Sequence, residues 1–175
     1  MKWIYPASED TFLLLDVLKK EEIGGKIIEI GTGSGLIGRW LKGKGQVIVT
    51  DINPHSVKKA KEMGLKAIKS DLFEKINGKF DIIIFNPPYL PMDVKTEKWM
   101  DRATIGGKEG WETIEKFLQQ AKKHLEKQGR IYIVFSSRTG DIKRIAKKIG
   151  YKVKILKKQG FFFETLFVAK LWRDQ

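Results

Sequence analysis

Short apolar runs alternate with amphipathic segments along the chain. Five of the runs have the length and composition of buried strands, and segments with helical periodicity separate them. Such alternation predicts a mostly parallel sheet with helices on both of its faces. The strands are expected at Lys26–Ile30, Gln46–Thr50, Lys66–Lys69, Phe80–Phe85 and Arg130–Ser136, and the helices at Glu9–Lys20, Leu36–Lys42, Pro54–Met63, Trp111–Leu125 and Asp141–Lys148.

The C-terminal end breaks this alternation. Tyr151–Lys158 and Phe161–Leu171 flank Gln159-Gly160, which is a two-residue hairpin turn signal. A seven-stranded, mostly parallel sheet that ends in an antiparallel hairpin is therefore expected, unlike the usual dinucleotide-binding order. Asn86–Gly110 is rich in Pro and Gly, and such a long irregular stretch is usually functional. Because no repeat or linker interrupts residues 1–175, we expect a single domain with no separate substrate-recognition domain.

The composition excludes several classes of protein. With no cysteine, the chain forms neither disulfides nor thiolate metal sites. Its longest apolar stretches, such as Ile82–Phe85 and Phe161–Phe163, are too short to span a bilayer, and the N-terminus lacks the apolar region of a signal peptide. We therefore expect a cytoplasmic protein that makes no membrane contact.

The charge is large and unevenly distributed. The formal net charge is +13, and residues 121–175 hold fifteen Lys or Arg against four acids. This basic half could attract RNA, DNA or a partner that works on the ribosome, so nucleic acid is a candidate partner. The alternative is a lysine-rich solvated surface, which also suits a thermophile.

A glycine-rich segment follows the first predicted strand. Ile28-Glu29-Ile30 leads into Gly31-Thr32-Gly33-Ser34-Gly35, where missing side chains let a ligand approach the backbone and the next helix offers free N–H groups. Gly33–Gly38 also matches the G-x-G-x-x-G fingerprint of dinucleotide sites, so the loop alone leaves the cofactor open. Glu29 favours a cofactor with ammonium and sulfonium charges, because its carboxylate would repel a pyrophosphate.

Two acids follow the next two predicted strands. Asp51 is placed to accept hydrogen bonds from two ribose hydroxyls, and its alternative role is an acid near the N-cap of the helix that starts at Pro54. Asp71 can accept from an adenine amino group while Leu72 packs on the ring, and its alternative role is an ordinary turn aspartate.

The strand Phe80–Phe85 delivers Asn86, Pro87, Pro88 and Tyr89 to the carboxyl edge of the sheet, where open α/β sheets bind ligands. A planar amide or amine nitrogen is a poor nucleophile because its lone pair is delocalised. The Asn86 side-chain oxygen and the Pro87 carbonyl can each accept one N–H of such an NH₂ group and hold it in line with a methyl donor. Tyr89 can pack against the planar target.

No metal is expected to take part. The two histidines, His55 and His124, lie far apart in the sequence and are interpreted as surface residues, and no cluster of metal-ligating residues accompanies them.

With these residues in place, the chain resembles the archaeal and eukaryotic branch of the HemK-like protein N5-glutamine methyltransferases. Asn-Pro-Pro-Tyr alone also occurs in adenine-N6 enzymes, but its combination with Glu9-Asp10-Thr11 and Gly106-Gly107 is far more discriminating. The likeness covers nearly the whole chain and is carried by Tyr5…Ser8-Glu9-Asp10-Thr11 with Phe12-Leu13-Leu14-Leu15, Glu29–Gly35, Thr50–Pro54, Asn86–Tyr89 and Ala103–Gly110.

This resemblance implies an α/β fold of the class I (Rossmann-like) S-adenosylmethionine-dependent methyltransferases. It implies methyl transfer to the glutamine of the Gly-Gly-Gln loop in class I peptide release factors, with Asn86–Tyr89 holding that glutamine. Thr11 would touch the methionine end of the S-adenosyl-L-methionine cofactor. The other residues expected at the cofactor are Glu29, Gly31, Thr32, Gly33, Gly35, Asp51, Ile52, Asp71, Leu72 and Asn86.

The chain departs from the family pattern at its N-terminus. The motif proline falls one place early, at Pro6 with Ala7 following, so the entry of this segment is expected to differ. We also expect the chain to lack the extra N-terminal substrate-binding domain of the bacterial relatives. Eukaryotic relatives work with a small zinc-binding activator subunit that covers an apolar surface near the third strand, and a similar partner is a candidate here.

Three other functions stay open from the sequence. An N6-adenine RNA or DNA methyltransferase would agree with Asn-Pro-Pro-Tyr and the basic half, and would transfer the methyl group to nucleic acid. A nicotinamide-dependent oxidoreductase depends on the glycine loop alone. A binding module without catalysis would leave the intact Asn86–Tyr89 motif unexplained.

Overall fold

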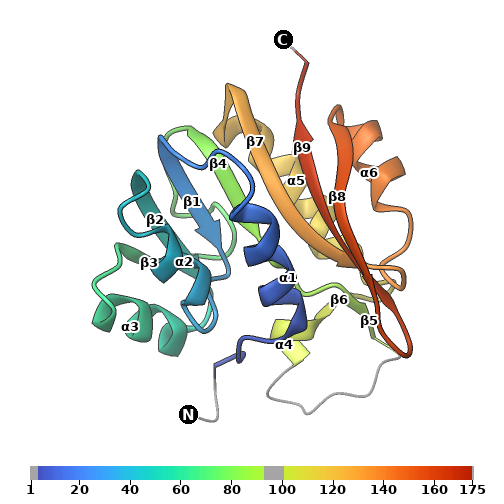
Figure 1. Cartoon of the computed structure of the whole chain (residues 1–175), viewed down its shortest axis with the longest axis horizontal. Coiled ribbons are helices and arrows are strands. Elements are labelled where there is room, and N and C mark those ends of the chain that lie inside the picture. The colour runs from blue at the N-terminus through green and yellow to red at the C-terminus, as the bar shows by residue number, and fades with distance from the viewer. Residues whose placement is uncertain (1–3, 93–100, 175) are drawn as a thin grey trace.

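A seven-stranded sheet forms the centre of the computed structural model, which describes residues 4–92 and 101–174 (Figure 1). The strand order is β3-β2-β1-β4-β7-β9-β8. The first five strands in this order run parallel, and β9 pairs antiparallel with both β7 and β8. Their bounds are β1 Lys26–Ile30, β2 Gln46–Asp51, β3 Ala67–Lys69, β4 Phe80–Phe85, β7 Leu125–Ser136, β8 Lys152–Gly160 and β9 Thr165–Trp172.

Helices cover both faces of this sheet. Helix α1 packs across β7, β8 and β9 on one face and also contacts α2, whereas α5 lies behind the strands and packs against α6 (Figure 1). Helix α3 packs on β2 and β3 at one edge. Their bounds are α1 Glu9–Leu18, α2 Leu36–Leu41, α3 Pro54–Glu62, α5 Glu112–His124 and α6 Ile142–Ile149. In the part of the chain that the structure describes, no helix combines the length and apolarity needed to cross a membrane.

The central strands are buried on both faces, which explains their almost continuous apolar runs. Ile28 of β1, Ile83 of β4 and Ile133 of β7 are fully buried, and Phe117 of α5 packs in the same core. Tyr132 is also buried, and its hydroxyl donates a 2.7 Å hydrogen bond to Glu21. The predicted fold, a mostly parallel sheet that ends in an antiparallel hairpin, is therefore confirmed.

The hairpin turn differs from the prediction. Strand β8 continues through Gln159 and Gly160, which pair with Leu166 and Thr165, so the turn is the four residues Phe161–Glu164. A two-residue turn of the expected type requires positive φ at its centre, and Gly160 does not have it. Instead, the Phe161 N–H donates a 2.7 Å hydrogen bond to the Glu164 carbonyl and closes the longer turn.

Two further predictions need correction. Strand β7 begins at Leu125, directly after α5, rather than at Arg130. The stretch expected to be irregular contains the short helix α4 (Asp101–Thr104) and a two-stranded parallel sheet, formed by β5 (Leu90–Pro91) and β6 (Ile105–Gly107). Residues 93–100 of that stretch lie outside the described residues.

Replacing Ile83 by alanine should lower the free energy of unfolding by about 3 kcal/mol, because a fully buried side chain in the central strand leaves a cavity. Urea unfolding followed by circular dichroism measures the change. Lys61→Ala on the exposed side of α3 is the control and should change stability by less than about 0.5 kcal/mol. Equal losses in the two variants would contradict this account of the core.

Candidate active site

A cavity of about 660 Å³ opens where β1, β2 and β4 end. In the strand order β2 and β3 lie on one side of β1 and β4 lies on the other, so the chain changes direction there. Open α/β sheets bind their ligands at such a switch point. The predicted residues that line the cavity are Thr11, Glu29, Gly31, Thr32, Gly33, Asp51, Ile52, Asp71, Leu72, Asn86, Pro87 and Pro88.

Two predicted site residues, Gly35 and Tyr89, are not among the residues that line this cavity. Gly35 is the residue before α2 and has φ 81°; a side chain there would approach the Met63 sulfur to 2.9 Å. Its role in the structure is to start α2 beside α3. The sequence pattern could not separate this role from ligand contact, since both favour glycine.

The glycine loop after β1 is held in one conformation by its own backbone. The Thr32 N–H donates to the Thr50 carbonyl at 2.8 Å, and the Gly35 N–H donates to the Thr32 carbonyl at 2.8 Å. Gly31 and Gly33 have φ values of 69° and 49°, in the left-handed region where a side chain is strained. The loop therefore presents backbone rather than side chains to the cavity.

Glu29 is a buried carboxylic acid at the floor of the cavity. The Thr32 hydroxyl donates a 2.8 Å hydrogen bond to Glu29 Oε2. Burial raises the pKa of Glu29 to about 8, and the nearby Asp51 carboxylate adds to the rise. A cation that entered the cavity would favour the ionised form of this group.

Asp51 bridges the glycine loop and the turn after β2. Its Oδ2 accepts a 2.8 Å hydrogen bond from the Gly33 N–H, and its Oδ1 accepts one of 2.8 Å from the Asn53 N–H. Burial raises its pKa, in opposition to these hydrogen bonds. Asp51 does not cap α3, because Asn53 does so by accepting a 2.9 Å hydrogen bond from the His55 N–H. The Ser56 side chain and the Ile52 N–H also donate toward Asp51 and lower its pKa.

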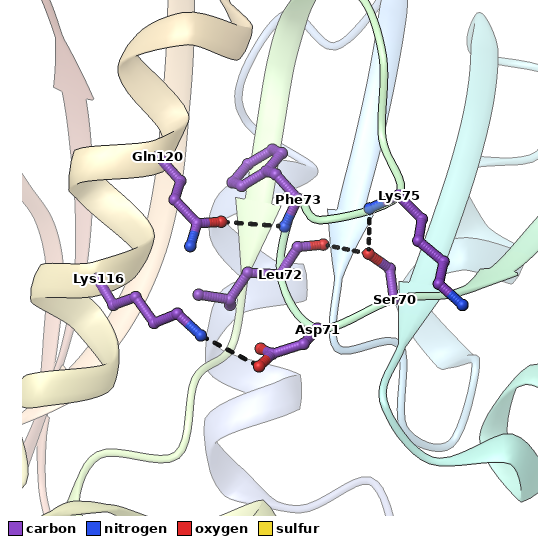
Figure 2. Close-up of polar contacts among 7 residues, drawn as sticks. All are labelled: Ser70, Asp71, Leu72, Phe73, Lys75, Lys116 and Gln120. Atoms are coloured by element: carbon purple, nitrogen blue, oxygen red, sulfur yellow. Dashed lines mark hydrogen bonds and ion pairs between the residues drawn. The ribbon is translucent and has the colours of Figure 1, made fainter.

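The turn after β3 supplies another wall of the cavity (Figure 2). Ser70 Oγ donates to the Leu72 carbonyl at 3.0 Å and accepts from the Lys75 N–H at 3.1 Å. Leu72 has φ 46°, which is unusual for a branched aliphatic residue, and its side chain is buried at the cavity. Asp71 forms a 3.1 Å ion pair with Lys116, so it also connects this turn to helix α5 (Figure 2).

The segment after β4 brings an unpaired acceptor to the cavity. Asn86 Oδ1 is buried and has no hydrogen-bond partner in the structure. A buried acceptor without a partner costs free energy, so its presence in the folded protein calls for an explanation. Rotation about χ2 can turn this oxygen toward the cavity, which Asn86 lines together with Pro87 and Pro88.

Tyr89 is 8% exposed and is not one of the residues that line the cavity. Its hydroxyl donates to Asp10 Oδ2 at 3.2 Å, and its carbonyl accepts from the Thr139 hydroxyl at 3.0 Å. Burial is the main cause that raises the pKa of Tyr89 far above its ordinary value. Tyr89 is thus tied to Asp10 and Thr139, and its stacking on a target stays a prediction.

Asp10 is the centre of the N-terminal hydrogen bonds. It accepts from Ser8 at 2.8 Å, from Tyr5 at 3.2 Å and from the Thr11 hydroxyl at 3.1 Å, in addition to Tyr89. Burial and the Asp10 charge raise the pKa of Tyr5 to about 12. Asp10 and Tyr5 both line the cavity. The sequence analysis named them only as members of a family motif and did not predict this contact.

Gly106 and Gly110 let two loops approach each other. A Cβ atom on Gly106 would lie 2.6 Å from the Pro88 carbonyl oxygen, and one on Gly110 would lie 2.7 Å from the Tyr89 carbonyl oxygen. The Tyr89 N–H also donates to the Thr104 carbonyl at 3.1 Å. These glycines therefore hold the backbone of the Asn86–Tyr89 segment, which explains why they accompany it in the sequence.

The described residues contain no group of His, Asp and Glu that could hold a metal ion. His55 is exposed at the rim of the cavity, and His124 stacks on Phe73 with ring centroids 4.7 Å apart. Further lining residues are Ser34, Ala103 and Ile105, which the sequence carried only within its motifs, and Ile37 and Thr113, to which it gave no role.

Comparison with known proteins agrees with this site. The family model described as the methyltransferase small domain matches residues 8–163. A putative protein N5-glutamine methyltransferase of Methanocaldococcus jannaschii is 39% identical over 97% of this chain and 92% of that protein. The eRF1 methyltransferase catalytic subunit of Schizosaccharomyces pombe is 31% identical over 97% of this chain and 89% of its own length.

A solved structure shows the same architecture. The E. cuniculi Mtq2–Trm112 complex, described as responsible for methylation of the eRF1 translation termination factor, aligns with a TM-score of 0.82 and 28% identity, over 99% of this chain and 100% of the matched chain. The predicted class I fold, HemK-like resemblance and S-adenosylmethionine dependence are thus confirmed. The chain belongs to the methyltransferase small-domain family, as a HemK-like, S-adenosylmethionine-dependent methyltransferase.

Proposed function

We propose that this enzyme methylates N5 of the glutamine in the Gly-Gly-Gln loop of a class I peptide release factor. The observation that carries the proposal is Asn86 Oδ1, a buried acceptor without a partner on a residue that lines the cavity. An amide NH₂ group of the target supplies the donor that this oxygen lacks. The names of the M. jannaschii and S. pombe relatives, which refer to glutamine and to eRF1, support the same substrate.

The cavity lining fits the proposed cofactor. Four acidic residues line it, Asp10, Glu29, Asp51 and Asp71, and the described lining residues include no Lys or Arg that would pair with a pyrophosphate. Glu29 suits the cationic end of S-adenosylmethionine, and the Asp51 carboxylate, which lines the cavity, suits ribose hydroxyls. Leu72 offers an apolar contact for the adenine ring, with Asp71 beside it. Thr11 lines the same cavity beside Asp10 and is assigned to the methionine end.

The residues after β4 would orient the nucleophile. Bound S-adenosylmethionine supplies an electrophilic methyl carbon on its sulfonium. Asn86 Oδ1 and the Pro87 carbonyl would each accept one N–H of the glutamine amide, which aims the nitrogen and stabilises the positive charge that builds on it. Pro87 contributes a carbonyl with a restricted backbone and no competing N–H. Tyr89, anchored to Asp10, would keep these acceptors in place.

A small activator subunit is a further part of the proposal. The matched chain of the E. cuniculi structure comes from a complex with Trm112. In the present sheet the outermost strand on the cofactor side is β3, which has a free edge in the strand order. We propose that this partner contacts the edge near β3 and that the partner itself binds zinc. We also propose a cytoplasmic location, which a role in translation termination supports.

Transfer to the glutamine is tested by incubating the enzyme, with its activator, labelled S-adenosylmethionine and the release factor. Mass spectrometry should find one added methyl group on the glutamine of Gly-Gly-Gln. If the label is absent from that residue, or is found on nucleic acid offered in the same assay, the proposed substrate is wrong.

Asn86→Ala should lower turnover by about 10²-fold or more, since it removes one acceptor that acts on the reacting nitrogen. Cofactor affinity, measured by calorimetry, should change little. Asn77→Ala, at an exposed position before β4, is the matched control and should keep the wild-type rate. Equal rates for the Asn86 and Asn77 variants would refute the role given to Asn86.

The affinity for S-adenosylmethionine should rise with pH up to about pH 8 and then level off. In the free protein the pKa of Glu29 is about 8, so the carboxyl is largely protonated at neutral pH, and a bound cation would favour its ionised form and release the proton. Calorimetry from pH 6 to 9 measures this dependence. In the Glu29→Gln variant the part of the pH dependence that is due to Glu29 should disappear. The part that is due to titration of the ligand should remain, because it is common to both proteins. An unchanged slope in the variant would show that Glu29 does not sense the cofactor.

Contact with nucleic acid, expected from the basic half, is assigned to a second hollow lined by Lys127, Arg130, Lys154, Lys170 and Arg173. Arg130 lies toward the amino end of β7, so this hollow faces away from the cofactor cavity and would tether rather than present a methyl acceptor. Binding of a structured RNA should weaken steeply as salt rises, and Lys154→Ala should reduce that slope. Salt-independent binding, or none, would count against this contact.

A further inference from the structure

Two phenylalanines protrude from the turn between β8 and β9. Phe162 is 94% exposed and Phe163 is 82% exposed, and their rings meet edge to face with centroids 4.9 Å apart and an interplanar angle of 74°. Isolated exposed apolar residues are normal on a protein surface, but two adjacent rings almost entirely in water are not needed for folding. We call Phe161–Glu164 the aromatic tip.

The aromatic tip has a firm base. Gly160 and Thr165 pair at the end of the β8–β9 ladder, and the Phe161 N–H donates to the Glu164 carbonyl at 2.7 Å. Thr165 also exchanges two hydrogen bonds with Ser137, of 2.8 Å and 3.0 Å. Phe161 packs against the main hydrophobic core. The tip is therefore presented on ordered backbone, which reduces the entropy lost on binding.

The aromatic tip lies at the same edge of the sheet as the cavity. Strand β9 starts where β7 ends, with Leu166 opposite Ser136, and the β8–β9 turn lies near β5 in the view of Figure 1. Glu164 is close enough to Tyr89 to be one of the carboxylates that raise the pKa of its hydroxyl, after burial and Asp10. The tip is thus a neighbour of the segment that contains Asn86.

We propose that the aromatic tip docks the protein that carries the target glutamine, by inserting Phe162 and Phe163 into an apolar hollow beside that glutamine's loop. The inference rests on the proposed function, because a folded protein that places a side chain in the cavity must lie over this edge of the sheet. Aromatic side chains on a rigid support are the commonest source of binding energy in such contacts. They would supply affinity for the whole partner that a single glutamine side chain cannot supply.

The geometry favours a protein over a nucleic acid at this place. In this edge-to-face pair the edge of one phenyl ring already covers a face of the other, which leaves fewer faces for stacked bases. The aromatic tip also contains no Lys or Arg that would pair with phosphates. An apolar hollow in a protein accepts the two rings together.

The test compares wild type with a Phe162→Ser, Phe163→Ser double variant. Calorimetry with the intact release factor should show affinity weakened by about tenfold or more, the usual effect of removing central aromatic contacts. In turnover assays the KM for the intact protein should rise while kcat stays the same. With a short peptide of the Gly-Gly-Gln loop, the two enzymes should have equal rates.

Three controls separate the possible outcomes. Lys147→Ser, at an exposed position of α6, should bind like wild type, and Phe162→Leu should recover part of the affinity. Unchanged melting temperature and cofactor affinity would exclude a folding defect. Unchanged binding of the release factor by the double variant would overturn the inference, as would a loss confined to RNA binding or to self-association in sedimentation. Weakened binding without any glutamine methylation by wild type would support docking and refute the proposed reaction instead.

Discussion

A single buried carboxylate, Asp10, connects the parts of the site that come from distant points in the sequence. It accepts hydrogen bonds from Tyr5 and Ser8 before α1, from Thr11 in α1 and from Tyr89 after β4. These contacts fasten the N-terminal segment across the end of the sheet, where it closes one side of the cavity. Without this junction the glycine loop and the segment after β4 would still form, but no common wall would join them.

Electrostatics then determine which ligand the cavity suits. Burial opposes ionisation of both Glu29 and Asp51, and the hydrogen bonds from the Thr32 hydroxyl and the Gly33 N–H only partly compensate. The site thus favours ligands that carry positive charge and hydroxyl donors. A nicotinamide dinucleotide also brings ribose hydroxyls, but its two phosphates would find no Lys or Arg among the described residues that line the cavity. The same glycine pattern therefore serves different cofactors according to the acids beside it.

The sequence predicted the strands of the sheet well because buried parallel strands leave continuous apolar runs, as in Phe80–Phe85. It missed β5 and β6, since their pairing depends on the close approach of Gly106 and Gly110 to a loop distant in sequence. The motif identified Tyr89 as important but could not show that its ring faces inward. Contact of individual residues with cofactor or substrate, and the single-domain organisation, stay predictions.

The unpaired oxygen of Asn86 has a consequence for what happens after the reaction. Unmodified glutamine carries two hydrogens on its amide nitrogen, and in the proposed arrangement each would pair with one of two acceptors, Asn86 Oδ1 and the Pro87 carbonyl. The methylated product has only one hydrogen left, so one acceptor loses its donor again while a methyl group occupies its place. Such a site would hold its product less firmly than its substrate, and it would stop after adding a single carbon.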